Sequence, residues 1–83
     1  MNVKNIGPNQ TQVTFPQGML VLYSYNTPVA VFVSSICESG IPTGWYKTSK
    51  KYSKTTIKHI NQWYNGEYQE KDQQWFHNLI SGI

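Results

Sequence analysis

The chain has 83 residues, of which 39% are hydrophobic and 14% aromatic, so an intrinsically disordered chain is excluded and a single small domain over residues 1–83 is expected. Only 13% of the residues are charged, and the net charge of +3 rests on lysine without any arginine. Because arginine is the usual reader of guanine edges and of bidentate phosphates, a lysine-only balance favours loose electrostatic contact over specific readout.

The first half of the chain has the pattern of β-strands. Residues 1–10 are polar and contain Gly7 and Pro8, which indicates a flexible lead-in. Apolar, β-branched segments then alternate with short turns, which favours an antiparallel meander. The segment 34–44 is rich in Ser, Gly and Pro and indicates a loop. Strands are therefore predicted at residues 11–15, 19–25, 29–33 and 45–52.

The second half of the chain changes to helical spacing. Ile57, Ile60 and Tyr64 share one face of a predicted helix. Ser53 is suited to the N-cap of this helix, and Asn65-Gly66 to its C-terminal stop.

A second helix is predicted to begin near Tyr68 and to end at Gly82. Three acids, which the helix dipole favours near an N-terminus, are expected in its first turns: Glu67, Glu70 and Asp72. Its apolar side is expected to hold Trp75, Phe76, Leu79 and Ile80. The fold class is then α+β, with a small antiparallel four-stranded β-meander followed by two C-terminal helices packed on it.

The chain shows no signature of catalysis. No nucleophile motif, paired carboxylates or phosphate-binding glycine loop is present. Cys37 is the single cysteine, so no intramolecular disulfide forms, and with two histidines it does not suggest a closed metal site. The apolar runs are too short for a signal peptide or a membrane span. These features favour a non-enzymatic, cytoplasmic protein without a metal, a cofactor or a membrane partner.

The segment KKYSKTTIKHINQWY, residues 50–64, holds the parts of an anion site. A helix N-terminus offers unpaired N–H groups and a positive dipole end, and here lysines and hydroxyls accompany it. The alternative is an ordinary capped helix with a solvated lysine face and with His59 packed against Trp63. The candidate residues for a nucleic-acid or phosphate ligand are Lys47, Lys50, Lys51, Ser53, Lys54, Thr55, Thr56, Lys58 and His59.

Aromatic residues beside these lysines suggest a second kind of contact. Single-stranded nucleic acid is often held by base stacking on a sheet face together with positive charge. Tyr25, Trp45 and Tyr46 are the candidates for such stacking. In a domain this small most aromatic side chains must be core, and burial is expected for Phe15, Phe32, Trp63 and Trp75.

Two segments, LYSYNTPVAVFV and WYKTSKKYSKTTIKHINQWY, carry a family resemblance. Their order of Ser-Tyr-x-Thr-Pro-Val-Ala, a variable loop, and Tyr-Ser-x-Thr-Thr-x-x-His-Ile-Asn with a following Trp resembles a group of short, uncharacterised proteins of tailed phages and prophages. The matching positions lie between residues 12 and 64. The resemblance implies a viral origin and a host-cell setting, and it implies no activity.

The same pattern has a structural alternative. Thr55 or His59 is able to bond to the turn at residues 25–27 and to lock the corner between strand and helix. Three functions stay open: binding of nucleic acid or another phosphate-bearing ligand, inhibition of a host defence or transcription complex, and self-association through edge strands.

Overall fold

The computed structural model describes residues 2–7, 9–15, 18–34, 42–50 and 52–81. In this part of the chain one sheet has the order β1-β2-β3-β4-β5-β6, and two helices accompany it. The strands are β1 (Asn2–Gly7), β2 (Gln10–Phe15), β3 (Met19–Ser24), β4 (Thr27–Val33), β5 (Gly44–Thr48) and β6 (Gln69–Lys71). The helices are α1 (Lys54–Trp63) and α2 (Gln73–Ser81). None of the described helices has the length and apolar character that crossing a membrane requires.

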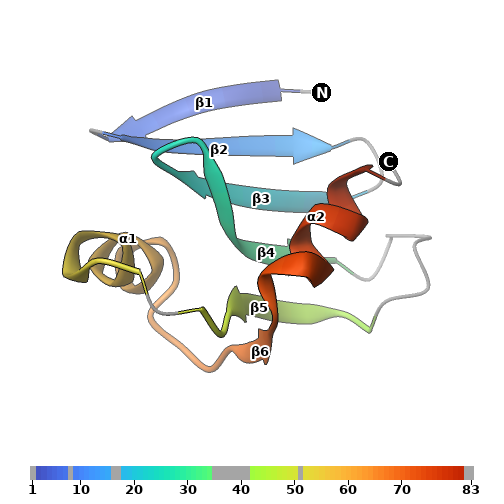
Figure 1. Cartoon of the computed structure of the whole chain (residues 1–83). Coiled ribbons are helices and arrows are strands. Elements are labelled where there is room, and N and C mark those ends of the chain that lie inside the picture. The colour runs from blue at the N-terminus through green and yellow to red at the C-terminus, as the bar shows by residue number, and fades with distance from the viewer. Residues whose placement is uncertain (1, 8, 16–17, 35–41, 51, 82–83) are drawn as a thin grey trace.

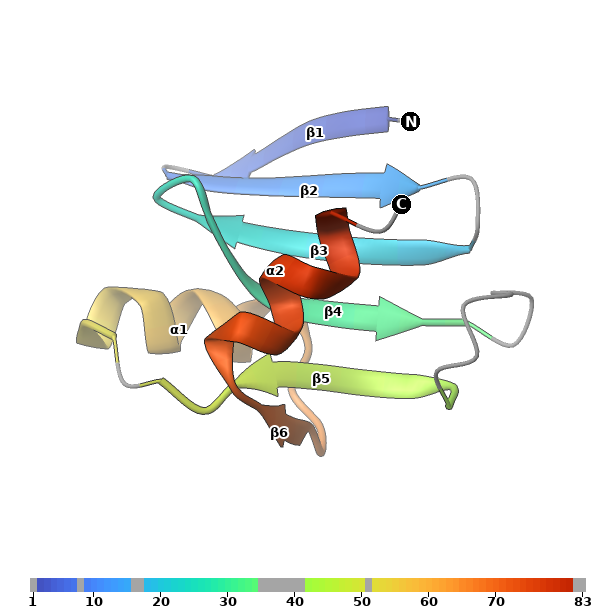
Figure 2. The same cartoon turned by 45° about the vertical axis from the view of Figure 1, so that its right-hand side comes forward.

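The first five strands run antiparallel, each to the next, as a meander. β6 is parallel to β5, because α1 forms a crossover between these two strands. Figures 1 and 2 show α2 in front of the sheet and α1 on the opposite face. The α+β class, with a mostly antiparallel sheet and two helices, is confirmed. The prediction of four strands was wrong, because β1 and β6 add a strand at either edge.

The segment expected as a lead-in contains β1 instead. It pairs with β2 along its length, from Asn2 opposite Thr14 to Gly7 opposite Gln10, with an irregularity near Ile6. The prediction missed this strand because its sequence is polar. An edge strand needs main-chain hydrogen bonds to one neighbour only and buries few side chains, so it does not require an apolar sequence. Val3, for example, is 61% exposed.

The second helix begins later than predicted. Residues 69–71 form β6, and α2 begins at Gln73. Asp72 caps the start of α2, because its carboxylate accepts a hydrogen bond from the backbone N–H of Trp75 at 2.8 Å. Glu67 and Glu70 therefore precede the helix rather than stabilise its first turn, and Glu70 lies in β6.

The core has one half on either face of the sheet, because side chains alternate along each strand. On the α2 face, Val21 and Val31 lie opposite each other and are fully buried with Phe76 of α2. On the α1 face, Leu22 and Ala30 form the corresponding pair and pack with Ile60 of α1. Of the four aromatic residues expected in the core, Phe15 is buried, whereas half-burial is found for Phe32, Trp63 and Trp75.

Candidate functional site at the corner between β5 and α1

The start of α1 is capped as the sequence predicts. Ser53 has an extended backbone, and its hydroxyl accepts a hydrogen bond from the backbone N–H of Thr56 at 3.3 Å. Lys54, Thr55 and Lys58 all lie exposed on the outer side of this helix. The cap therefore already uses one of the N–H groups that an anion would need.

A buried polar cluster joins α1 to the end of β3. The Ser24 hydroxyl lies 2.9 Å from Nδ1 of His59 and 3.1 Å from the Thr56 hydroxyl. All three side chains are nearly inaccessible to solvent. The Tyr25 ring stacks on His59 with 6.0 Å between ring centroids. The helix residues predicted to make this contact were Thr55 or His59, and His59 makes it. Its polar partner is Ser24, directly before the 25–27 turn, and Thr56 takes part instead of Thr55.

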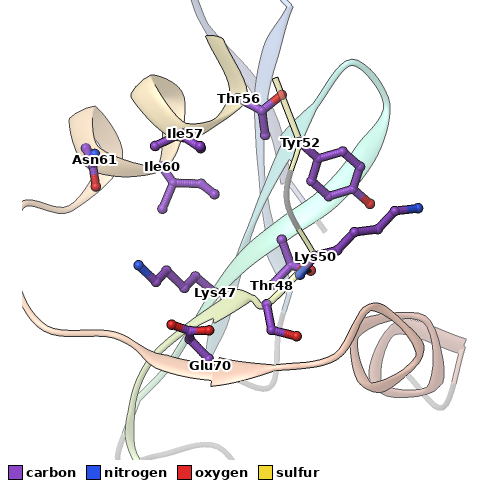
Figure 3. Close-up of a pocket in the computed structure, with 10 residues that line it drawn as sticks. Lys47, Thr48, Lys50, Tyr52, Thr56, Ile57, Ile60, Asn61 and Glu70 are labelled. Atoms are coloured by element: carbon purple, nitrogen blue, oxygen red, sulfur yellow. Dashed lines mark hydrogen bonds between the residues drawn. The ribbon is translucent and has the colours of Figure 1, made fainter. Parts of the chain in front are cut away.

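A pocket of about 190 Å³ lies between this helix and the strands below it. Figure 3 shows its walls: α1 contributes Ile57, Ile60 and Asn61, and the end of β5 lies opposite. The hydroxyl groups of Thr48, Ser49, Tyr52 and Thr56 also belong to the lining residues. The charged residues of the lining are Lys47, Lys50 and Glu70.

The two pocket lysines are held by neighbouring rings. The Lys47 ammonium lies 5.8 Å from the centre of the Tyr68 ring, and the Lys50 ammonium lies 5.3 Å from that of Tyr52. Figure 3 shows the two lysine side chains extending in different directions, Lys47 below Asn61 and Lys50 beside Tyr52. The two ammonium groups therefore lie on different sides of the lining.

Glu70 modifies the electrostatics of this pocket. It is the cross-strand partner of Lys47, because β6 pairs in parallel with β5. Two lysines and one glutamate leave the described lining with one net positive charge. The sequence analysis did not predict Glu70 as a pocket residue, because its position suggested the start of a helix. It lies beside β5 because the chain crosses over through α1 before forming β6, and no pattern of neighbouring residues indicates that crossover.

A glutamine of α2 fixes the floor of the corner. The side-chain oxygen of Gln73 accepts hydrogen bonds from the Thr48 hydroxyl at 2.9 Å and from the Tyr52 hydroxyl at 2.8 Å. Its amide nitrogen donates to the carbonyl oxygen of Pro28 at 2.8 Å. Burial raises the pKa of the Tyr52 phenol, so this donor keeps its proton over the whole physiological range.

Only part of the predicted anion site comes together. Lys47, Lys50 and Thr56 line the pocket. Ser53 acts as the cap, and His59 is directed to Ser24 instead. Lys51 lies outside the described residues.

The predicted stacking residues do not form one surface. Tyr25 is 51% exposed, but Tyr46 is 1% exposed and packs on the α2 face against Trp75. Trp45 projects on the opposite face and is already stacked on Tyr64, with ring centroids 3.8 Å apart. The prediction that Tyr46 offers a stacking surface was therefore wrong. Adjacent residues of one strand point to opposite faces, so Tyr46 cannot lie on the same face as Trp45.

The chemical groups that the corner offers to a ligand are ammonium, hydroxyl, amide and carboxylate groups. Within the described residues, no group of three or more His, Cys, Asp or Glu side chains is arranged to hold a metal ion. Cys37 and most of the predicted 34–44 loop lie outside the described residues.

Comparison with known proteins places the chain in a family. A model described as a family of unknown function (DUF8033) matches residues 1–78, and the chain therefore belongs to this family. No curated protein and no solved structure matches the chain. The family match carries neither an activity nor a source, so the resemblance to tailed-phage proteins stays a prediction.

Proposed function

We propose that this domain is a non-enzymatic binding module that holds a phosphate-bearing ligand in the pocket between β5 and α1. The observation that carries the proposal is the presence of Lys47 and Lys50 in one pocket with four hydroxyl-bearing residues. Lysine ammonium groups bind phosphate as point charges. The Thr48 and Tyr52 hydroxyls already donate to Gln73, and the Thr56 hydroxyl is bonded to Ser24, so Ser49 is the lining hydroxyl proposed to donate to a phosphate oxygen.

The size of the pocket limits what enters it. Its 190 Å³ is smaller than the roughly 300–1,000 Å³ of pockets that enclose drug-sized ligands. A phosphate group with a small attached body fits this volume better than a whole nucleotide. Because Trp45 is already stacked and Tyr46 is buried, contact with nucleic acid would run through phosphates rather than through bases.

The buried Ser24–His59 pair supports a function without catalysis. A serine beside a histidine has the composition of an activated nucleophile. Ser24, however, is 2% exposed and His59 5% exposed, so a substrate cannot reach the hydroxyl in this arrangement. The pair instead positions α1 above the pocket.

The proposal is tested by fluorescence anisotropy with labelled, 5′-phosphorylated single- and double-stranded oligonucleotides at about 50 and 200 mM salt. Ribose 5-phosphate serves as an unlabelled competitor that carries the phosphate alone. Binding that falls steeply with salt, and that the competitor displaces, is expected. Lys47→Gln combined with Lys50→Gln is expected to weaken binding by about tenfold or more.

A matched control separates the pocket from general positive charge. Lys4→Gln combined with Lys58→Gln removes the same charge from exposed residues that do not line the pocket. Equal losses in the two double variants would show that the pocket is not the site. Absence of any binding by the unaltered chain would reject the proposal as a whole.

Tyr25 favours a second candidate function, the binding of a partner protein, which in a phage setting would be a host protein. Its backbone has a φ of 51°, in the left-handed region that bulky residues rarely adopt. An exposed tyrosine kept at such a position resembles the aromatic anchors of protein interfaces. Pulldown from host lysate with the unaltered chain and with Tyr25→Gly tests this candidate, because a specific partner should be lost with the ring.

A further inference from the structure

A second hollow lies on the other face of the sheet, between α2 and the end of the β3–β4 hairpin. We call it the α2 groove, and its volume is about 470 Å³. Gln74, Asn78 and Ser81 follow one side of α2 along it, at the spacing of successive helical turns. Tyr23 and Asn26 contribute from the hairpin. Figure 2 shows α2 crossing this face of the sheet.

The chemistry of the α2 groove differs from that of the pocket at the β5–α1 corner. Among the described residues that line it there is no lysine, arginine, aspartate or glutamate. A phosphate or carboxylate ligand would find no opposite charge in this lining, and neither would a cationic ligand. Side-chain amides, hydroxyls and one imidazole provide most of its polar groups, while Pro28 and Ile80 add apolar surface.

The amide groups of the α2 groove are already oriented. The side-chain nitrogen of Gln74 donates to the side-chain oxygen of Asn78 at 2.9 Å. This bond leaves the Gln74 oxygen as an acceptor and the Asn78 nitrogen as a donor, side by side on one turn of helix. Such a pair matches two neighbouring hydroxyl groups, each of which donates and accepts.

The walls of the α2 groove are also fixed relative to each other. Gln73 at the start of α2 donates to the Pro28 carbonyl of β4 at 2.8 Å, which ties the helix to the strand below. Burial raises the pKa of the Tyr23 phenol, which therefore stays a neutral donor. A preformed arrangement reduces the entropy that a ligand loses on binding.

The sheet beneath the α2 groove does not suit an added peptide strand. β3 is paired with β2 and with β4, whereas β4 is paired with β5 only over residues 30–33. At Pro28, which lines the groove, the carbonyl already accepts from Gln73 and the proline has no N–H to donate to an added strand. Recognition by strand addition requires a free edge. The polar groups left for a ligand are therefore those of side chains.

We propose that the α2 groove binds a neutral saccharide, whose vicinal hydroxyl groups bond to the Gln74–Asn78 amide pair and whose ring packs against Tyr23. The site is separate from the phosphate pocket, since it lies on the opposite face of the sheet and shares no lining residue with it.

The test is a titration of the isotope-labelled chain, followed by two-dimensional NMR, with maltose, lactose, cellobiose and chitobiose. Glucuronic acid and a neutral tripeptide amide are the comparison ligands. At least one disaccharide is expected to shift the resonances of the α2 groove saturably, with a Kd of about millimolar. Gln74→Ala and Asn78→Ala are each expected to raise that Kd by about three- to tenfold.

Gln62→Ala is the matched control, because Gln62 is an exposed amide on α1 outside the groove. The site would be supported if Gln62→Ala binds the disaccharide with the Kd of the unaltered chain while both groove variants bind it with a higher Kd. Shifts with none of the disaccharides up to about 20 mM, or tighter binding of the tripeptide amide, would overturn the proposal. Equal effects of all three variants would also overturn it.

Discussion

The hydroxyl oxygen of Ser24 lies 2.9 Å from Nδ1 of His59, and this contact joins the end of β3 to α1 across 35 positions of sequence. Both side chains are buried, and Thr56 shares the same hydroxyl at 3.1 Å. The position of α1 above its pocket therefore depends on a polar bond as well as on apolar packing.

Ser24→Ala is expected to lower the free energy of unfolding by about 1–3 kcal/mol, because it leaves a buried ring nitrogen of His59 without a partner. Urea denaturation followed by circular dichroism measures this loss. Thr55→Ala, at an exposed position of the same helix, should stay within about 0.5 kcal/mol of the unaltered chain. An unchanged midpoint for Ser24→Ala would show that the contact does not stabilise the fold.

Gly66 is expected to be intolerant of even a methyl group. A Cβ atom there would lie 2.6 Å from Cε2 of the Tyr64 ring, and it would meet Cζ and the hydroxyl oxygen of that ring as well. The ring cannot retreat without leaving Trp45, whose plane is within 4° of its own. Gly66→Ala should therefore cost about 1–3 kcal/mol and change the tryptophan fluorescence.

A double-mutant cycle checks this cause. In a Tyr64→Ala background, Gly66→Ala should change stability by less than about 0.5 kcal/mol, since the clashing ring is gone. An equal cost in both backgrounds would assign the effect to the backbone of residue 66 instead.

Gln73 is expected to be the most sensitive amide of α2. Gln73→Leu removes an acceptor shared by Thr48 and Tyr52 and a donor to Pro28. A loss of about 2–3 kcal/mol in the free energy of unfolding follows from three missing hydrogen bonds. Gln74→Leu, one position further along, is exposed and should cost less than about 0.5 kcal/mol. Similar losses at both positions would contradict this assignment.

Alkaline pH is expected to destabilise the domain through Tyr68. Burial, with a smaller contribution from Tyr64, raises the pKa of this phenol above its usual value of 10.0. Above about pH 10 the unfolded chain loses the proton while the folded chain keeps it, so the folded state binds more protons and stability falls as pH rises. Tyr23 and Tyr52 act in the same direction.

Urea midpoints measured between about pH 8 and pH 11 report this slope. Tyr68→Phe should lower stability near neutral pH, because the hydroxyl donates to the Ile60 carbonyl at 2.8 Å. It should also flatten the fall above pH 10 without abolishing it. A slope equal to that of the unaltered chain would show that Tyr68 does not control the alkaline limit.

Several elements follow from neighbouring residues alone. The strand at 29–33 is readable from its β-branched residues, and α1 from the Ser53 cap and the spacing of its isoleucines. These signals are local, because they concern main-chain conformation within a few residues. β1 and β6 lack such a signal, since edge strands are defined by a partner and not by their own composition.

The candidate site also has some features that neighbouring residues determine and others that depend on residues distant in the chain. The cap at Ser53 and the lysine-rich character of residues 47–58 are properties of one continuous segment, and the sequence suffices for them. The tertiary structure decides which of those lysines share a pocket. There β6 pairs in parallel with β5, and this pairing places Glu70 beside Lys47. The burial of Tyr46, and the placing of two hollows on opposite faces, likewise depend on which face each helix covers. Such relations involve residues distant in the chain, and they exist only once loop closure and packing have brought those residues together.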